Sequence, residues 1–198
     1  NATVEILVDG VKVGEAKADG DGKWEYTFDP ALTEGEHEIA IKVTDQAGNT
    51  GAESDPIKID VDTKNPDKPV TPDAPGNGGH VNTTTPTIKG VTEPNATVEI
   101  LVDGIKVGEA KADGDGNWEY TFDPVLTEGE HEITIKVTDQ AGNTGPESDP
   151  IKIDVDTKNP DKPVTPDAPG NGGHVNTTTP TIKGVTEPNA TVEVLVDG

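Results

Sequence analysis

A ten-residue sequence that occurs three times defines the organisation of this chain. Asn-Ala-Thr-Val-Glu-Ile-Leu-Val-Asp-Gly stands at residues 1–10 and again at residues 95–104, and it returns at residues 189–198 with Val194 in place of Ile100. Successive copies are 94 residues apart, and the residues between them repeat as well. A tandem repeat of this period predicts copies of one small domain rather than one large fold.

The period divides the chain into five segments. We expect residues 1–63 to form a unit that lacks its first strand, residues 81–157 to form a complete unit, and residues 175–198 to hold the first strands of a third. Residues 64–80 and 158–174 lie between the units and are rich in proline and glycine. Such segments are expected to be extended, semi-stiff linkers.

The composition excludes several classes of function. The chain has 38 Asp and Glu residues against 15 basic residues, none of them arginine, and a formal net charge of −23. Nucleic acids and anionic membrane surfaces need a basic face, so both are excluded as partners. Without cysteine there is no disulfide framework. The chain has 17 prolines, 23 glycines and only 30% hydrophobic residues, so it could be disordered. The residue pattern has to decide between a folded and a disordered chain.

The residue pattern favours ordered strands over disorder. Apolar residues alternate with polar ones over short stretches bounded by turn residues such as Asp103-Gly104, and a period of two is typical of half-buried strands. No helical period persists. Six or seven short strands in one unit predict an all-β protein with a β-sandwich fold. The expected strands of the complete unit are residues 85–90, 97–102, 105–111, 118–122, 131–137 and 151–155.

Five motifs follow one another in each unit. They are Thr-Pro-Thr-Ile-Lys-Gly, Glu-Pro-Asn-Ala-Thr-Val-Glu-Ile-Leu-Val-Asp-Gly, Trp-Glu-Tyr-Thr-Phe, Val-Thr-Asp-Gln-Ala-Gly-Asn and Asp-Val-Asp-Thr-Lys-Asn-Pro. In this order they resemble the bacterial immunoglobulin-like repeats of giant surface adhesins and biofilm-associated proteins. The resemblance implies tandem immunoglobulin-like β-sandwich domains of about seven strands, located outside the cell at the bacterial surface. The segment after Thr157 is longer and richer in proline than is usual in the family, which puts a compact domain junction in doubt.

The resemblance also implies structural Ca²⁺. Two of the family's motifs hold the ion, and matching them position by position pairs Asp45 with Asp62 and Asp139 with Asp156. Ca²⁺ takes six to eight oxygen ligands, so further residues must contribute. The other reading is that these aspartates end strands and cap turns. The additional oxygen ligands are expected from Asn49, Asn143, Glu93 and Glu187.

Two Asp-Gly-Asp-Gly sequences look like the opening of an EF-hand loop. They stand at residues 19–22 and 113–116. An EF-hand needs a bidentate Glu at position 12 of the loop, where this chain has Pro30 and Pro124. We therefore predict hairpin turns here, with at most a weak cation site facing the solvent.

The histidines and tryptophans of this sequence do not indicate a binding site. Trp24 and Trp118 could stack on sugars, but both alternate with Tyr and Phe on one face of an expected strand, which predicts a place in the core. No histidine has a second His or Cys at zinc-ligand spacing, so all are expected at the surface. These are His37, His80, His131 and His174.

A structural function is expected rather than a catalytic one. The sequence has no cysteine nucleophile, Gly-x-Ser-x-Gly elbow or phosphate-binding glycine loop, and an active site copied in every tandem unit would be unusual. We expect a Ca²⁺-stiffened stalk that projects an adhesive region from the bacterial surface or mediates contact between cells in a biofilm. Two alternatives stay open: a glycan- or protein-binding module, and an accessory domain of a secreted polysaccharide-degrading enzyme.

Several partners are expected for such a stalk. Neighbouring repeats of the same chain are the first, and a host or bacterial surface ligand is another, although the sequence does not identify it. Residues 179–184 carry the strand that residues 1–62 lack, so one molecule could complete the first domain of the next by strand addition. This would give a head-to-tail filament.

Overall fold

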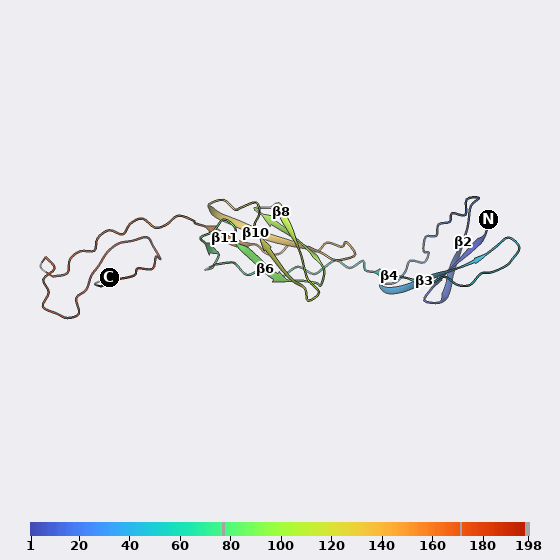
Figure 1. Ribbon diagram of the computed structural model, residues 1–198, viewed down its shortest axis with the longest axis horizontal. Coiled ribbons are helices and arrows are strands. Elements are labelled where there is room, and N and C mark those ends of the chain that lie inside the picture. The colour runs from blue at the N-terminus through green and yellow to red at the C-terminus, as the bar shows by residue number, and fades with distance from the viewer. Residues whose placement is uncertain (77, 171, 197–198) are drawn as a thin grey trace.

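The computed structural model describes residues 1–76, 78–170 and 172–196, and the regular structure in these residues is all β, as predicted (Figure 1). They include no helix that is long and apolar enough to cross a membrane. The first unit contains β1 (Thr3–Val8), β2 (Val11–Lys17), β3 (Gly35–Thr44) and β4 (Ile57–Val61). The complete unit contains β5 (His80–Val81), β6 (Thr87–Val91), β7 (Thr97–Val102), β8 (Ile105–Lys111), β9 (Asn117–Thr121), β10 (Gly129–Thr138) and β11 (Ile151–Val155).

The complete unit consists of two sheets. The larger sheet has the strand order β5-β11-β10-β7-β8, and the smaller sheet pairs β6 with β9. All neighbours are antiparallel except β5, which runs parallel to β11. The hairpin between β7 and β8 turns at Asp103 and Gly104, whose φ angles of 51° and 79° suit a two-residue turn with both central residues at positive φ.

One hydrophobic core joins the two sheets. In the larger sheet, alternate residues point inward: Val98 and Ile100 of β7 are 0% exposed, and Ile135 of β10 is 1% exposed. The smaller sheet contributes Ile88 and Trp118 to the same buried cluster. The period-two pattern of the sequence is therefore confirmed, and the unit is an immunoglobulin-like β-sandwich.

Two glycines allow aromatic rings of β9 to lie close to neighbouring strands. A Cβ atom added to Gly90 of β6 would lie 2.9 Å from the ring of Trp118, and one added to Gly108 of β8 would lie 2.3 Å from the Tyr120 hydroxyl. The indole of Trp118 thus covers the backbone of β6 directly. The burial of this tryptophan depends on the presence of that strand.

The first unit has only the larger sheet among the described residues. Its strand order is β2-β1-β3-β4, with the same registers as the equivalent strands of the complete unit. Residues 23–27, the counterpart of β9, form no strand, and the described residues of this unit include no counterpart of β6 to pair with them. Trp24 is consequently 41% exposed. The predicted place in a core is wrong for Trp24 and confirmed for Trp118, which is 4% exposed.

The C-terminal segment also lacks partners for its strands. Residues 175–196 were expected to hold strands of a third unit, but they form none and are exposed, while residues 197 and 198 lie outside the described residues. A strand needs a neighbour for its backbone hydrogen bonds, and the remaining strands of a third unit are not part of this sequence. Head-to-tail association through residues 179–184 stays a prediction.

Candidate functional site

The loop after β10 is shaped by an aspartate that caps its own turn. Asp139 Oδ1 accepts hydrogen bonds from the backbone N–H groups of Gly142 and Asn143, at 2.8 and 2.9 Å, and Oδ2 accepts one from Asn143 Nδ2 at 2.8 Å. The side-chain bond from Asn143 is the main cause that lowers the pKa of Asp139. Asp45 and Asn49 make the same bonds in the first unit, at 2.8 and 2.9 Å. These aspartates act as turn caps, whether or not they also hold an ion.

The aspartates that follow β4 and β11 cap turns as well. Asp62 Oδ1 accepts the N–H of Lys64 at 3.0 Å, and Asp156 Oδ1 accepts the N–H of Lys158 at the same distance. In both units a glutamate from the loop before β3 or β10 binds the threonine that comes next in the chain. The residues that follow the last strand therefore have the same local structure in both units.

The strand registers contradict the expected pairing of these aspartates within one unit. Gly129 at the start of β10 pairs with Val155, whereas Asp139 follows the far end of the same strand. At ~3.3 Å per residue, a ten-residue strand separates Asp139 from Asp156 by roughly 30 Å. The same register separates Asp45 from Asp62. Consecutive antiparallel strands end at opposite poles, so neither pair can share one ion inside its unit.

Instead, the structure brings Asp62 of the first unit to the loop of the second. Asn143 Nδ2 donates a hydrogen bond to the backbone carbonyl of Asp62 at 2.9 Å while it also holds Asp139. Asp62, Asp139 and Asn143 thus meet at the junction between the units. Asp45, Asn49 and Asp156 have no such neighbour among the described residues.

The remaining expected ligands lie apart from this contact. Glu93 belongs to the turn before β7, at the same pole as Asp139 because Thr97 pairs with Thr138. Its carbonyl accepts the N–H of Ala96 at 3.3 Å, and its carboxylate has no bond among the described residues. Glu187 occupies the equivalent turn in the exposed C-terminal segment.

The junction has the right chemistry for Ca²⁺ but an incomplete set of ligands. Asp62, Asp139 and Asn143 offer hard oxygen donors, which suit Ca²⁺. However, the described residues contain no group of three or more His, Cys, Asp and Glu side chains placed to hold a metal ion. An ion here would need backbone carbonyls and water to complete six to eight ligands.

The Asp-Gly-Asp-Gly sequences form tight turns but not the predicted hairpins, because β8 and β9 lie in different sheets and residues 23–28 form no strand. Asp113 Oδ1 accepts the N–H groups of Asp115 and Asn117 at 2.9 and 2.8 Å. Asp19 makes the equivalent bonds in the first unit. The backbone bonds around Asn117 are the main cause that lowers the pKa of Asp113.

A histidine–aspartate pair braces the hairpin turn after β7. His131 Nδ1 lies 2.8 Å from Asp103 Oδ2, and Nε2 lies 3.0 Å from the carbonyl oxygen of Thr127. Both ring nitrogens therefore face acceptors, which suits the doubly protonated imidazolium. The bond to Asp103 is the main cause that raises the pKa of His131. The N–H of Glu132, bound to the same carboxylate, is the main cause that lowers the pKa of Asp103.

The first unit repeats this arrangement with His37 and Asp9, also 2.8 Å apart. The side chains of His37 and His131 are 12% exposed, so the expected surface location holds only in part for both. It is confirmed for His80, whose side chain is 73% exposed. The sequence did carry a signal, because the aspartates of the two hairpin turns, Asp9 and Asp103, are each followed by a histidine 28 residues later.

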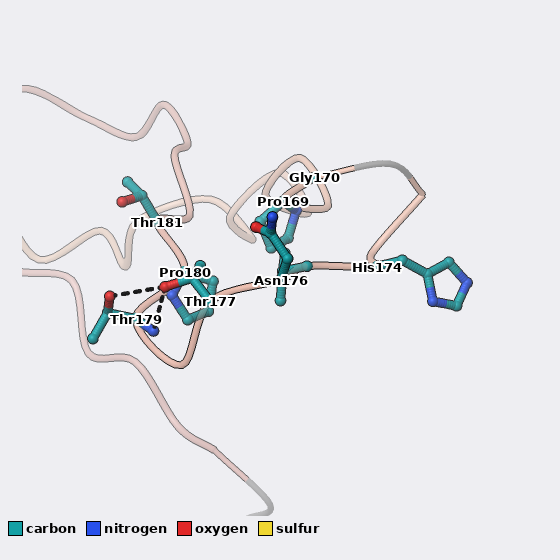
Figure 2. A pocket seen from close by; sticks show the side chains of 9 residues that line it. Pro169, Gly170, His174, Asn176, Thr177, Thr179, Pro180 and Thr181 are labelled. Carbon is teal, nitrogen blue, oxygen red and sulfur yellow. Dashed lines mark hydrogen bonds between the residues drawn. The ribbon is translucent and has the colours of Figure 1, made fainter.

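A hollow in the C-terminal segment has no catalytic character. Figure 2 shows its lining of proline, threonine, asparagine and glycine, with the His174 ring pointing away from the other side chains. Thr177 Oγ1 accepts the N–H of Thr179 at 3.1 Å, and Thr83 and Thr85 make the same turn in the complete unit at 3.2 Å. The hollow is therefore formed by a local turn of the backbone.

Known proteins resemble this chain over part of their length. Bacillopeptidase F from Bacillus subtilis (strain 168) is 32% identical over 125 residues, which are 63% of this chain and 8% of that protein. The fibronectin(III)-like modules of Clostridium thermocellum CbhA are 20% identical, cover 77% of each chain and give a TM-score of 0.46. A tetra-tandem repeat from the extending region of a large adhesion protein is 22% identical, covers 85% of this chain and 46% of its own, and gives a TM-score of 0.41.

The biofilm associated protein BSP domain is 19% identical, with a TM-score of 0.36, and the match covers 80% of this chain and 25% of that one. The family described as "Bacterial Ig-like domain" matches residues 1–63 and 74–157, which is well over half of the sequence. Two repeats of one immunoglobulin-like unit, each matched separately, show that the chain belongs to the bacterial Ig-like domain family.

Proposed function

We propose that these repeats form a structural stalk of a bacterial cell-surface adhesin, which projects an adhesive region or joins cells in a biofilm. The observation that carries this proposal is the joint between the units. The residue after β4 of the first unit meets the loop after β10 of the second, with Asn143 Nδ2 2.9 Å from the Asp62 carbonyl oxygen. Because the loop after β10 and the end of β11 lie at opposite poles of a unit, each added repeat lengthens the chain (Figure 1).

We infer that Ca²⁺ stiffens this joint. Asp62, Asp139 and Asn143 would hold the ion, with Glu93 at the same pole as a further source of oxygen. When bound, the ion supplies positive charge between carboxylates of a chain whose formal net charge is −23. Extracellular Ca²⁺-binding modules work at about 10⁻⁴ to 10⁻³ M, so the stalk would stiffen outside the cell.

A structural role at the cell surface also agrees with the side chains. Several acidic groups of the described residues cap turns or pair with lysines, and these contacts are structural. Trp118, which could have stacked on a sugar, lies in the core at 4% exposure. These features favour a spacer over an enzyme or a glycan-binding module.

Calcium binding is tested by matched variants of the full chain. We expect the thermal midpoint to rise with Ca²⁺ and to saturate, with about 2.7 kcal/mol of stabilisation at a hundred times Kd. Asp139→Asn and Asp62→Asn should abolish this rise. Asp45→Asn and Asp156→Asn occupy equivalent positions that lack the junction contact, so they should leave it intact. A midpoint that Ca²⁺ does not move would contradict calcium stiffening.

The stalk itself is tested by the distance between units. The chain has no cysteine, so Glu15→Cys and Glu109→Cys place two spin labels at equivalent exposed strand positions. Pulsed electron paramagnetic resonance should give a narrow distance distribution in Ca²⁺. A distribution as broad as that of a flexible linker would contradict a stiff stalk.

A second candidate is an accessory module of a larger secreted enzyme. The similarity to a small part of Bacillopeptidase F favours it. In that case deletion of the repeats from the parent protein would change the enzyme's activity or substrate range. Under the stalk proposal the same deletion would shorten the distance that the parent protein spans. It would leave any enzymatic activity of that protein unchanged.

A further inference from the structure

The two proline-spaced segments have the same sequence but different surroundings. We call residues 64–76 the strap. Pro66 and Pro72 of the strap are buried, whereas their counterparts Pro160 and Pro166 in the C-terminal segment are exposed. The difference cannot come from the local sequence, which is identical. It comes from the complete unit that follows the strap in the chain.

One end of the strap is held by the loop between β10 and β11. Lys68 Nζ lies 2.7 Å from Asp149 Oδ1, next to the bond between Asn143 and the chain just before the strap. A Cβ atom added to Gly145 would lie 2.5 Å from the carbonyl oxygen of Pro66, so only glycine permits this approach. Gly145 is buried, whereas its counterpart Gly51 is exposed.

Residues that come shortly after the strap are held by β11. Asp154 donates its N–H to the carbonyl oxygen of Gly79 at 2.8 Å, and a Cβ atom on Gly79 would lie 2.4 Å from the carbonyl oxygen of Lys152. From there β5 continues parallel to β11. The chain is thus tied to the unit that follows it both at the strap and shortly after the strap.

We propose that the loop residues 143–149 form a docking surface, and that its occupant is the proline-spaced strap leaving the preceding unit. Docking joins two repeats without a metal ion. Proline suits this role because its fixed φ lowers the entropy lost on ordering. The surface goes beyond the proposed stalk, because it predicts a joint that holds even if Ca²⁺ never binds.

Limited proteolysis of the full chain in EDTA tests the proposal. Trypsin can cut after Lys64 and after Lys158, whose flanking sequences are the same. Cleavage needs local undocking of the segment, so we expect Lys64 to be cut at least about tenfold more slowly than Lys158. Equal rates would overturn the docking surface. Protection of Lys64 that appears only with Ca²⁺ would overturn it as well, since the joint would then rest on the ion.

Matched variants identify the surface. Gly145→Ala should bring the cleavage rate at Lys64 close to that at Lys158, because the added methyl collides with Pro66. Gly51→Ala, whose nearest neighbouring atom would be 3.7 Å away, should change nothing. Lys68→Ala should give a smaller acceleration, with Lys162→Ala as its control. If neither Gly145→Ala nor Lys68→Ala accelerates cleavage, the surface is not where we place it. Protection in EDTA reports on the strap and the Ca²⁺ titration reports on stiffening, so either proposal can fail alone.

Discussion

Residues 1–63 and 95–157 differ at only five positions, yet they form different structures. In the second copy the buried cluster draws on both sheets, and in the first it contains three buried residues, Ile6, Val8 and Ile39. The larger sheet is the same in both. What differs is the preceding segment, which supplies the strap, β5 and β6 to the second copy only. The complete unit of this chain therefore closes its core with residues that come before the repeated ten-residue motif.

The largest difference between the units is expected for the two tryptophans. Trp118→Ala should destabilise the complete unit by about 3 to 5 kcal/mol, because it empties a site between the two sheets. Trp24→Ala should cost about 1 kcal/mol or less, since that side chain is already 41% exposed. Urea unfolding followed by circular dichroism measures both in the full chain. Similar costs for the two variants would show that the first unit closes its core in another way.

A smaller difference is expected for a serine that binds β10. Ser148 is 6% exposed, and its hydroxyl accepts the N–H of Ile135 at 3.0 Å. Ser148→Ala leaves that buried donor without a partner and should cost about 1 to 3 kcal/mol. Ser54 makes the same bond to Ile41, at 3.1 Å, in an exposed setting. Ser54→Ala should cost about 0.5 kcal/mol, because water replaces the hydroxyl. Equal costs in the same unfolding experiment would show that the difference in burial between the two serines has no energetic effect.

No difference between the units is expected for the histidine pairs. The pKa of His131 and of His37 is raised above 6.5, chiefly by the aspartate partner in each case. The stabilisation that each protonated histidine gives the folded state is therefore fully present below pH 6.5. It is lost as pH rises through the higher pKa of the histidine in the folded state. Each aspartate's pKa is lowered from 3.8, so its contribution is lost only as pH falls through the folded-state value.

His131→Gln and His37→Gln should each reduce the fall in thermal midpoint between about pH 6 and pH 8, and to a similar extent. A wild-type midpoint that stays constant over this range would mean that the imidazolium is not the form that binds. An effect confined to one unit would mean that the open sheet does not hold its turn as the closed one does.

The sequence predicted the strands of the complete unit closely. Expected strands at 97–102, 105–111 and 151–155 have the same bounds in the structure, because their apolar alternation and their turn residues are both local signals. The burial of Trp118 also followed from alternation. Trp24 has the same local pattern, and its exposure could not be read from it, because burial depends on a strand about 30 residues earlier in the chain.

The candidate site was predicted less well, for a reason of geometry. The motifs located the aspartates, but position-by-position matching paired Asp139 with Asp156, at opposite poles of the unit. Two consecutive antiparallel strands always end at opposite poles, so the strand prediction contained enough information to reject that pair. The contact between Asp62 and Asn143 spans two units and leaves no local signal. The histidine pairs did leave one, in the constant spacing from the Asp-Gly turn.

The most direct test of the account is the environment of each tryptophan in the full chain at low concentration. Trp24→Phe leaves Trp118 as the single fluorophore, and Trp118→Phe leaves Trp24. We predict blue-shifted emission and slow acrylamide quenching for Trp118, with red-shifted emission and fast quenching for Trp24, because only Trp118 has β6 to cover it. Equal emission and quenching for the two would contradict the claim that the preceding segment closes the core.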